Sequence, residues 1–156
     1  MPIGLSDNGI SSTGRNRLLI AHSDWKHDEV FQGTTEDGQT VTLDGDSAHL
    51  HGPSPMQAVL MALCSCTSVD VVNILKKKRQ DLTALRVTAN ATQADTPPRI
   101  FTHIKLIYAV HGRLSRKAVE DAVSLSKSKY CSVSKMLEKA ATIEYDIVYP
   151  DGEPKA

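Results

Sequence analysis

Aromatic side chains and net charge are both scarce in this sequence of 156 residues. Phe, Trp and Tyr make up 4% of the chain, and 18 basic side chains balance 18 acidic ones. Stacking on nucleic-acid bases requires aromatic side chains, and binding to phosphates or to an anionic membrane surface requires excess positive charge. We therefore expect neither a nucleic acid nor a membrane as a partner.

Cysteine is also rare, and the first residues lack the apolar core of a secretory signal. The three cysteines are Cys64, Cys66 and Cys131, an odd number that does not suit a framework of structural disulfides. We therefore expect a cytoplasmic protein whose thiols are free.

The length predicts one domain with short flanking segments. Residues 1–16 are rich in Gly, Ser and Asn, which indicates a flexible lead-in, and residues 150–156 form a short polar tail. The single domain is then expected at residues 17–149, a size that buries a proper core.

The longest apolar segment runs from Ser54 to Arg79 and is predicted to be one helix. Ser54 is a favourable N-cap with Pro55 behind it, and the basic residues 76–79 oppose the negative end of the helix dipole. Apolar residues cover almost the whole circumference, which predicts a central helix buried on every side. A membrane-spanning helix is the weaker alternative, because polar residues including Asp70 interrupt the segment.

The remaining periodic segments predict strands separated by helices. The dipeptide Asp37-Gly38 between two of the strands is a strong hairpin signal. The predicted strands are Arg17–Ala21, Glu29–Thr35, Gln39–Leu43, Ala84–Gln93, Ile100–His111 and Thr142–Tyr149, and the two later helices are Ser115–Lys127 and Ser132–Ala140. This order indicates an α+β fold with a mainly antiparallel sheet wrapped around the central helix. Because these elements give too little cover for a helix that is apolar all round, we expect a homodimer.

Two of the cysteines have contrasting predicted surroundings. Cys131 precedes the last predicted helix, where free N–H groups and the nearby Lys127 and Lys129 lower the pKa of a thiol. Cys66 lies mid-helix among apolar residues, which favours the protonated thiol, and Asp70 one turn further on disfavours a thiolate as well. Both cysteines also suit a purely structural role, since buried free cysteines are common as small hydrophobes.

Four short motifs resemble those of the OsmC/Ohr family. They are Gly52-Pro53-Ser54-Pro55-Met56, Ala62-Leu63-Cys64-Ser65-Cys66-Thr67, Val69-Asp70-Val71-Val72 and Tyr130-Cys131-Ser132-Val133. The segment PRIFTHI at residues 98–104 is similar to the YhfA-like branch of that family. The similarity extends from about Val30 to Tyr149, which is most of the chain.

The resemblance implies an OsmC-like fold in an intertwined homodimer with the long helices at the interface. Enzymes of the family reduce organic hydroperoxides or hydrogen peroxide with a cysteine pair and an external dithiol or lipoyl reductant, without a bound cofactor. By motif position, Cys66 corresponds to the cysteine that attacks the peroxide and Cys131 to the one that resolves the product, while Cys64 inherits no role. The implied activity is thiol-dependent reduction of organic hydroperoxides.

The sequence departs from the family pattern at the groups that activate the first cysteine. Peroxide-reducing members carry a Glu ten residues before that cysteine, where this chain has Met56. They also carry an Arg that pairs with both, and this chain has no Arg between Asp24 and Cys66. A buried thiol without a guanidinium beside it has little reason to ionise.

Four residues are candidates to support the thiols in place of those groups. His49 and His51 precede the central helix and either promote a thiolate or are solvated loop residues. Arg99 either holds its hairpin or binds an anion at the mouth of the pocket, and Asp70 is the fourth candidate. No spacing of His and Cys matches a known zinc pattern, so we expect no metal site.

Two other functions fit the same sequence. One is a non-catalytic protein that binds a small apolar ligand in a cleft lined by Met56, Leu60 and Leu63. The other is a redox sensor in which Cys66 and Cys131 oxidise slowly and signal to a partner.

Overall fold

The computed structural model describes residues 18–154 and divides the chain into two compact units, Met1–Gly52 and Pro53–Ala156. The predicted lead-in at residues 1–16 and the last two residues of the tail lie outside the described part. The assignment of residues 17–149 to one domain stays a prediction, and each unit is described here by itself.

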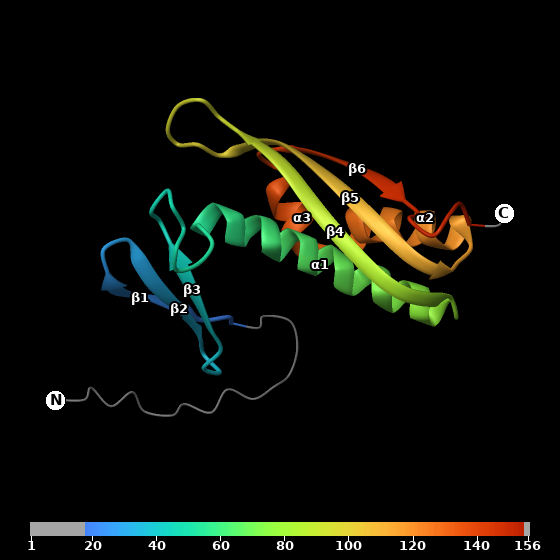
Figure 1. The fold of residues 1–156 in the computed structure, drawn as a ribbon, viewed down its shortest axis with the longest axis horizontal. Coiled ribbons are helices and arrows are strands. Elements are labelled where there is room, and N and C mark those ends of the chain that lie inside the picture. Colours follow the sequence, from blue (N-terminus) through green and yellow to red (C-terminus); the bar gives the residue numbers. More distant parts are fainter. Residues whose placement is uncertain (1–17, 155–156) are drawn as a thin grey trace. The chain divides into compact units, whose positions relative to one another are not determined.

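The first unit is a three-stranded antiparallel sheet, β1 (Ala21–His27), β2 (Val30–Thr35) and β3 (Thr40–Asp44), in that order (Figure 1). The predicted hairpin is confirmed: Thr34 pairs with Thr40, and Gly38 adopts a φ of +83° in the turn between them. The first strand was predicted too early. It begins at Ala21, and its side chains are all exposed. Its position is therefore fixed by its pairing with β2 and not by the burial of an apolar face.

The second unit begins with the long helix α1 (Pro55–Lys77), which confirms the predicted central helix. Ser54 and Gln57 form a capping box: the Gln57 N–H donates to Ser54 Oγ at 3.1 Å, and the Ser54 N–H donates to Gln57 Oε1 at 2.8 Å. Lys76 and Lys77 occupy the last turn, where positive charge is favourable.

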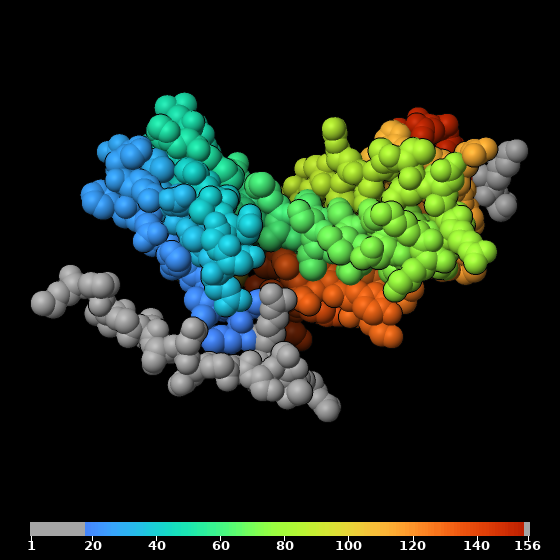
Figure 2. Space-filling model, turned by 90° about the horizontal axis from the view of Figure 1, so that it is seen from below, coloured from blue at the N-terminus to red at the C-terminus, as the bar shows by residue number. Residues whose placement is uncertain are grey.

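Burial of α1 on every side is not found within one chain. The fully buried positions form a single stripe, Leu63, Thr67, Val71 and Leu75, spaced four residues apart. On the opposite side Met61 is 56% exposed and Val69 is 59% exposed. Figure 2 shows side chains of α1 at the surface along much of the helix. One sheet and two short helices of the same chain cover only one side of this helix.

The second sheet has the order β4 (Asp81–Gln93), β5 (Phe101–Arg113) and β6 (Thr142–Val148). Strands β4 and β5 are antiparallel, whereas β5 and β6 are parallel. The alternation predicted for β5 is confirmed, because Ile104, Leu106, Tyr108 and Val110 are all buried. These residues face the helices, which lie on one side of the sheet (Figure 1). The predicted α+β class is therefore confirmed.

The connection between β5 and β6 contains α2 (Arg116–Leu125), a π-helical turn η1 (Ser126–Tyr130) and α3 (Ser132–Leu137). Both helices were predicted, and both end earlier than predicted. The π turn replaces the predicted end of α2: its closing bond runs from the Cys131 N–H to the Ser126 carbonyl at 2.8 Å. This wider turn buries both Ser126 and Cys131 completely.

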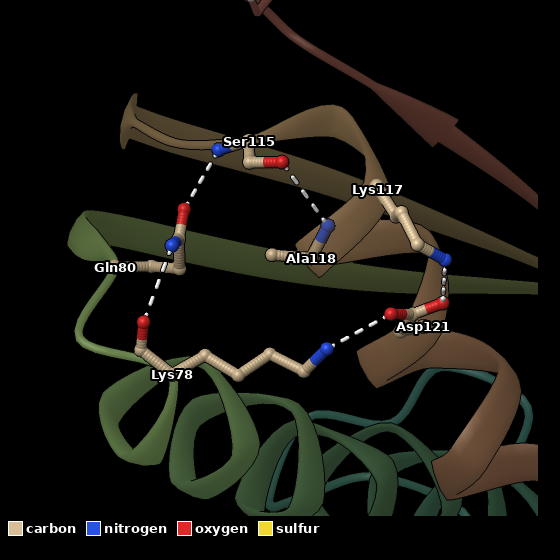
Figure 3. Close-up of polar contacts among 6 residues, drawn as sticks. All are labelled: Lys78, Gln80, Ser115, Lys117, Ala118 and Asp121. Atoms are coloured by element: carbon tan, nitrogen blue, oxygen red, sulfur yellow. Dashed lines mark hydrogen bonds and ion pairs between the residues drawn. The ribbon is translucent and has the colours of Figure 1, made fainter. Parts of the chain in front are cut away.

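The end of α1 is fastened to the start of α2 by side chains (Figure 3). Gln80 Oε1 accepts the Ser115 N–H at 2.7 Å, and Lys78 Nζ donates to Asp121 Oδ2 at 2.8 Å. By length and composition α1 is apolar enough to span a membrane, with a mean hydropathy of 1.9. In this structure three residues of its buried stripe, Leu63, Val71 and Leu75, belong to the core of the second unit.

Candidate functional site

The structure places Cys66 and Cys131, far apart in the sequence, in the same unit of the chain, on α1 and at the start of α3. Cys66 is half-buried on α1, and Cys131 is fully buried at the N-cap position of α3. The Cys131 Sγ accepts the Ser134 N–H at 3.4 Å, and the Cys66 side chain contributes to the raised pKa of the Cys131 thiol. All three cysteines are free.

Burial, with smaller effects from Cys66 and from the charge of Asp70, raises the pKa of Cys131 to about 12. The Ser134 N–H lowers the pKa, as expected at the start of a helix, but its effect is smaller than that of burial. The prediction of a lowered pKa was therefore wrong. The two lysines expected to help lie over aromatic rings instead, Lys127 5.5 Å from the Tyr145 centroid and Lys129 5.3 Å from that of Tyr130.

Cys64 lies beside a cavity that Cys66 does not line. Burial raises the pKa of its thiol, and the side chain lines a cavity of about 620 Å³ between α1 and β4. The cavity is lined by Pro53, Gln57, Leu60, Met61, Cys64, Ser65, Arg86, Val87, Thr88 and Ala89. Cys66 is not among these residues, as expected for two thiols that lie two positions apart on a helix. Of the three residues predicted to line a ligand cleft, only Leu60 is found here, because Leu63 is fully buried in the core and Met56 packs against that core.

Asp70 lies at one end of a chain of hydroxyl groups that crosses the core. The Ser126 Oγ donates to Asp70 Oδ2 at 2.9 Å. Thr67 Oγ1 lies 2.8 Å from Ser126 Oγ and 2.7 Å from the Tyr108 hydroxyl. Burial raises the pKa of Tyr108 to about 12 despite its hydrogen bond with Thr67. Asp70 also lines a cavity of about 380 Å³ together with Asn73, Ile74, Lys77, Lys78, Leu125 and Tyr130.

Sequence reasoning missed the three hydroxyl groups of this chain. Thr67 carried a signal, because it is a polar residue on the apolar stripe of α1 and precedes Asp70 by three positions, which places both on one side of a helix. Tyr108 was assigned to the core only as an apolar residue. Ser126 carried no signal, since its burial depends on the π turn.

The histidine candidates belong to the first unit. The His51 N–H donates to the buried Asp44 Oδ2 at 3.1 Å, and the His51 ring packs edge-on against His27 with centroids 5.3 Å apart. His49 Nδ1 lies 3.2 Å from the Asp44 carbonyl oxygen. These contacts organise the loop after β3, and a role beside Cys66 stays a prediction.

Arg99 is exposed in the loop between β4 and β5. Its carbonyl oxygen accepts the Gln93 Nε2–H at 2.7 Å, so its main chain holds the hairpin. Within residues 18–154, no group of three or more His, Cys, Asp and Glu side chains is placed to hold a metal ion.

The comparisons with known proteins agree on one family. The family model described as OsmC-like protein matches residues 44–146. Protein YhfA of Escherichia coli (strain K12) is 44% identical over 133 residues, covering 83% of this chain and 98% of the relative. The crystal structure of a hypothetical protein from Aquifex aeolicus VF5 is 29% identical, with a TM-score of 0.75 over 86% of this chain and 98% of that chain.

A more distant structure has the same fold. An organic hydroperoxide resistance protein OsmC from Legionella pneumophila has a TM-score of 0.61 and 16% identity over 84% of this chain and 96% of that chain. At this identity the similarity concerns the fold alone.

Proposed function

Because the chain belongs to the OsmC-like family, we propose that it reduces organic hydroperoxides with the thiols of Cys66 and Cys131. The observation that carries the proposal is the interaction of these two side chains inside the second unit, with Cys131 fully buried. A buried thiol of this kind is protected from other oxidants, and in the proposed reaction it condenses with the oxidised Cys66.

The reaction has three balanced steps. The Cys66 thiolate attacks the O–O bond of ROOH, which gives ROH and a sulfenic acid on Cys66. The Cys131 sulfur displaces the hydroxyl group of that sulfenic acid, which forms the Cys66–Cys131 disulfide and releases water. An external dithiol then reduces the disulfide by exchange and is itself oxidised to a disulfide.

Organic peroxides are the favoured substrate class. Hydrocarbon side chains of Ile74 and Leu125 line the cavity beside Asp70, so an alkyl group has apolar surface to contact. The name of the Legionella protein, an organic hydroperoxide resistance protein, supports the same class.

We also infer that the working form is a homodimer. Met61 and Val69 are large apolar residues more than half exposed on α1, and exposed apolar surface of this kind marks association sites. A second copy packed against this side of α1 would bury the apolar residues that the same chain leaves exposed.

A second candidate function is the binding of a small apolar ligand without catalysis. The cavity between α1 and β4 favours it, because Leu60, Met61 and Val87 form its lining and the Arg86 guanidinium is placed to meet an acidic group.

Peroxide consumption by purified protein tests the two proposals. We expect consumption of cumene hydroperoxide with dithiothreitol or dihydrolipoamide, and its loss in Cys66→Ser. Without a reductant, Cys131→Ser should react once and then stop as the sulfenic acid, which dimedone traps and mass spectrometry detects.

Cys64→Ser is the matched control, since Cys64 is also half-buried on α1 but lies two positions before Cys66, on a different side of the helix. It should retain wild-type consumption. Wild type no faster than Cys66→Ser would contradict the reductase, and a co-purified ligand retained by Cys66→Ser in native mass spectrometry would favour the binding protein.

A further inference from the structure

Asp70 and Lys77 are oppositely charged side chains that line one cavity of about 380 Å³. Within residues 18–154, neither of them belongs to an ion pair. Lys78 is the other cation of this cavity, and its ammonium group is paired with Asp121 at 2.8 Å (Figure 3). Among the described residues, the cavity therefore keeps one unpaired carboxylate and one unpaired ammonium group.

The Asp70 carboxylate is held in one orientation from inside the core. Ser126 Oγ donates to Asp70 Oδ2 at 2.9 Å, and this bond uses the only proton of that hydroxyl group. Thr67 must then donate to Ser126, and Tyr108 to Thr67. All three hydroxyl protons are therefore directed toward Asp70. No described residue donates to Asp70 Oδ1, so this oxygen is available to a ligand in the cavity.

The polar residues of the cavity follow one side of α1. Asp70, Asn73 and Lys77 are spaced three and four positions apart, and a rise of 1.5 Å per residue separates the first from the last by about 10 Å along the axis. Cys66 lies one turn before Asp70 on the same side of the helix. Along α1 the order is thus a thiol, a carboxylate, an amide and an ammonium group.

These groups match a small ligand that carries both an ammonium group and a carboxylate. The ammonium group pairs with Asp70, the carboxylate pairs with Lys77, and aliphatic surface is offered by Ile74 and Leu125. A fatty acid would leave Asp70 without a partner, which costs binding free energy. The cavity volume is near the lower end for small-molecule sites, which suits an amino acid or a short peptide.

We propose that the organic peroxides reduced by this chain are hydroperoxides of aliphatic amino acids and short peptides, bound through Asp70 and Lys77. The bond changes are those of the steps above: the O–O bond breaks, Cys66 becomes a sulfenic acid, and the amino acid leaves as its alcohol. Asp70 and Lys77 determine specificity and take no part in the bond changes. This proposal rests on the proposed function and names its substrate class.

Two hydroperoxides that differ only in the amino group test the substrate class. They are γ-hydroperoxyleucine and its deamino analogue, γ-hydroperoxyisocaproate. We expect wild type to prefer the first by about tenfold in kcat/KM, near the lower end for a hydrogen bond to a charged group. Asp70→Asn keeps an oxygen that accepts from Ser126 Oγ and should abolish the preference, whereas Asp70→Glu should retain part of it.

Asp146→Asn is the matched control, because it removes a carboxylate that pairs with Lys105 and lies outside this cavity. It should keep the full preference for γ-hydroperoxyleucine. The ratio of the two kcat/KM values is compared within each variant, so a general loss of activity does not affect the result.

Binding to Cys66→Ser tests the site without turnover. Chemical-shift titration should give a lower Kd for leucine than for isocaproate, which lacks the amino group, and than for leucinamide, which lacks the carboxylate. In this background, Asp70→Asn should remove the first difference and Lys77→Gln the second. The dispersion of the same spectra shows whether each variant is folded.

Reduction of cumene hydroperoxide without any preference for γ-hydroperoxyleucine would overturn this substrate class and leave the proposed function standing. A preference that persists in Asp70→Asn would also overturn it. Leucine binding that depends on Asp70, without consumption of any hydroperoxide, would contradict the proposed function and keep the cavity as an amino-acid site.

Discussion

Thr67 of α1 and Tyr108 of β5 are joined by a hydrogen bond of 2.7 Å between two buried hydroxyl groups. This bond connects the central helix to the middle strand of its sheet within the core of the second unit. Because a buried hydroxyl group without a partner is costly, the bond fixes how the helix and the sheet fit together.

We therefore expect Thr67→Val to destabilise the second unit by about 1–3 kcal/mol, because it leaves the hydroxyl groups of Tyr108 and Ser126 without their shared partner. Urea denaturation followed by circular dichroism measures the change. Thr67→Ser keeps the hydroxyl group and should lose less. Equal stability of Thr67→Val and wild type would contradict this account.

The capping box at the start of α1 gives a second stability prediction. Ser54→Ala removes the acceptor of the Gln57 N–H and should cost about 1 kcal/mol in the free energy of unfolding. Ser54→Asp keeps an acceptor at the N-cap and should stay close to wild type. Both variants are measured by urea denaturation, and a Ser54→Asp loss as large as that of Ser54→Ala would argue against the cap.

Stability should also fall at alkaline pH. Burial is the main cause that raises the pKa of Cys131 from 9.0 and that of Tyr108 from 10.0, in each case to about 12. Between pH 9 and pH 12 the folded protein keeps protons that the unfolded chain has released, so unfolding becomes more favourable as pH rises. This contribution is complete below the lower pH and is lost as pH passes the upper one.

Cys131→Ala tests that assignment, with urea midpoints measured under reducing conditions across the alkaline range. Lysine deprotonation affects wild type and variant alike, so the difference between their slopes isolates the thiol. The variant should lose stability less steeply than wild type. Identical slopes would show that the Cys131 thiol titrates normally in the fold.

The proposed homodimer predicts that a charge on the exposed side of α1 prevents association. Met61→Glu should weaken the dimer by more than about tenfold in Kd, or roughly 1.4 kcal/mol, because Met61 is 56% exposed on the side without cover. Met136→Glu is the control, because Met136 is a methionine on α3 that is 66% exposed. Sedimentation velocity at several concentrations measures the state, and a wild-type monomer at all of them would contradict the proposal.

Periodicity and capping predicted most of the fold. Ser54 and Pro55 located the start of α1, and the alternation around Tyr108 located β5 and its buried face. The first strand was misplaced because its sequence, AHSDWKH, has no apolar face and depends on pairing with β2. The sequence of β1 alone does not indicate that it pairs with β2.

The cysteine pair was predicted from the resemblance and not from spacing, since nothing local connects Cys66 with Cys131. The error over the pKa of Cys131 has a physical cause. The helix N-terminus acts as expected through the Ser134 N–H, but the π turn buries the sulfur so deeply that desolvation outweighs it. A departure from α-helical hydrogen bonding at Ser126 has no recognisable sequence pattern here.

The parallel pairing of β6 with β5 has a consequence for biosynthesis. Cys131 lies in the crossover between these two strands, so it is synthesised only after α1, β4 and β5. At translation rates of about 5–20 residues per second, the nascent chain carries the α1 thiol for seconds before its counterpart is even made. If Cys66 and Cys131 react as proposed, a Cys66 sulfenic acid formed during that interval has no second cysteine to condense with, so newly made chains should be the population most open to irreversible overoxidation.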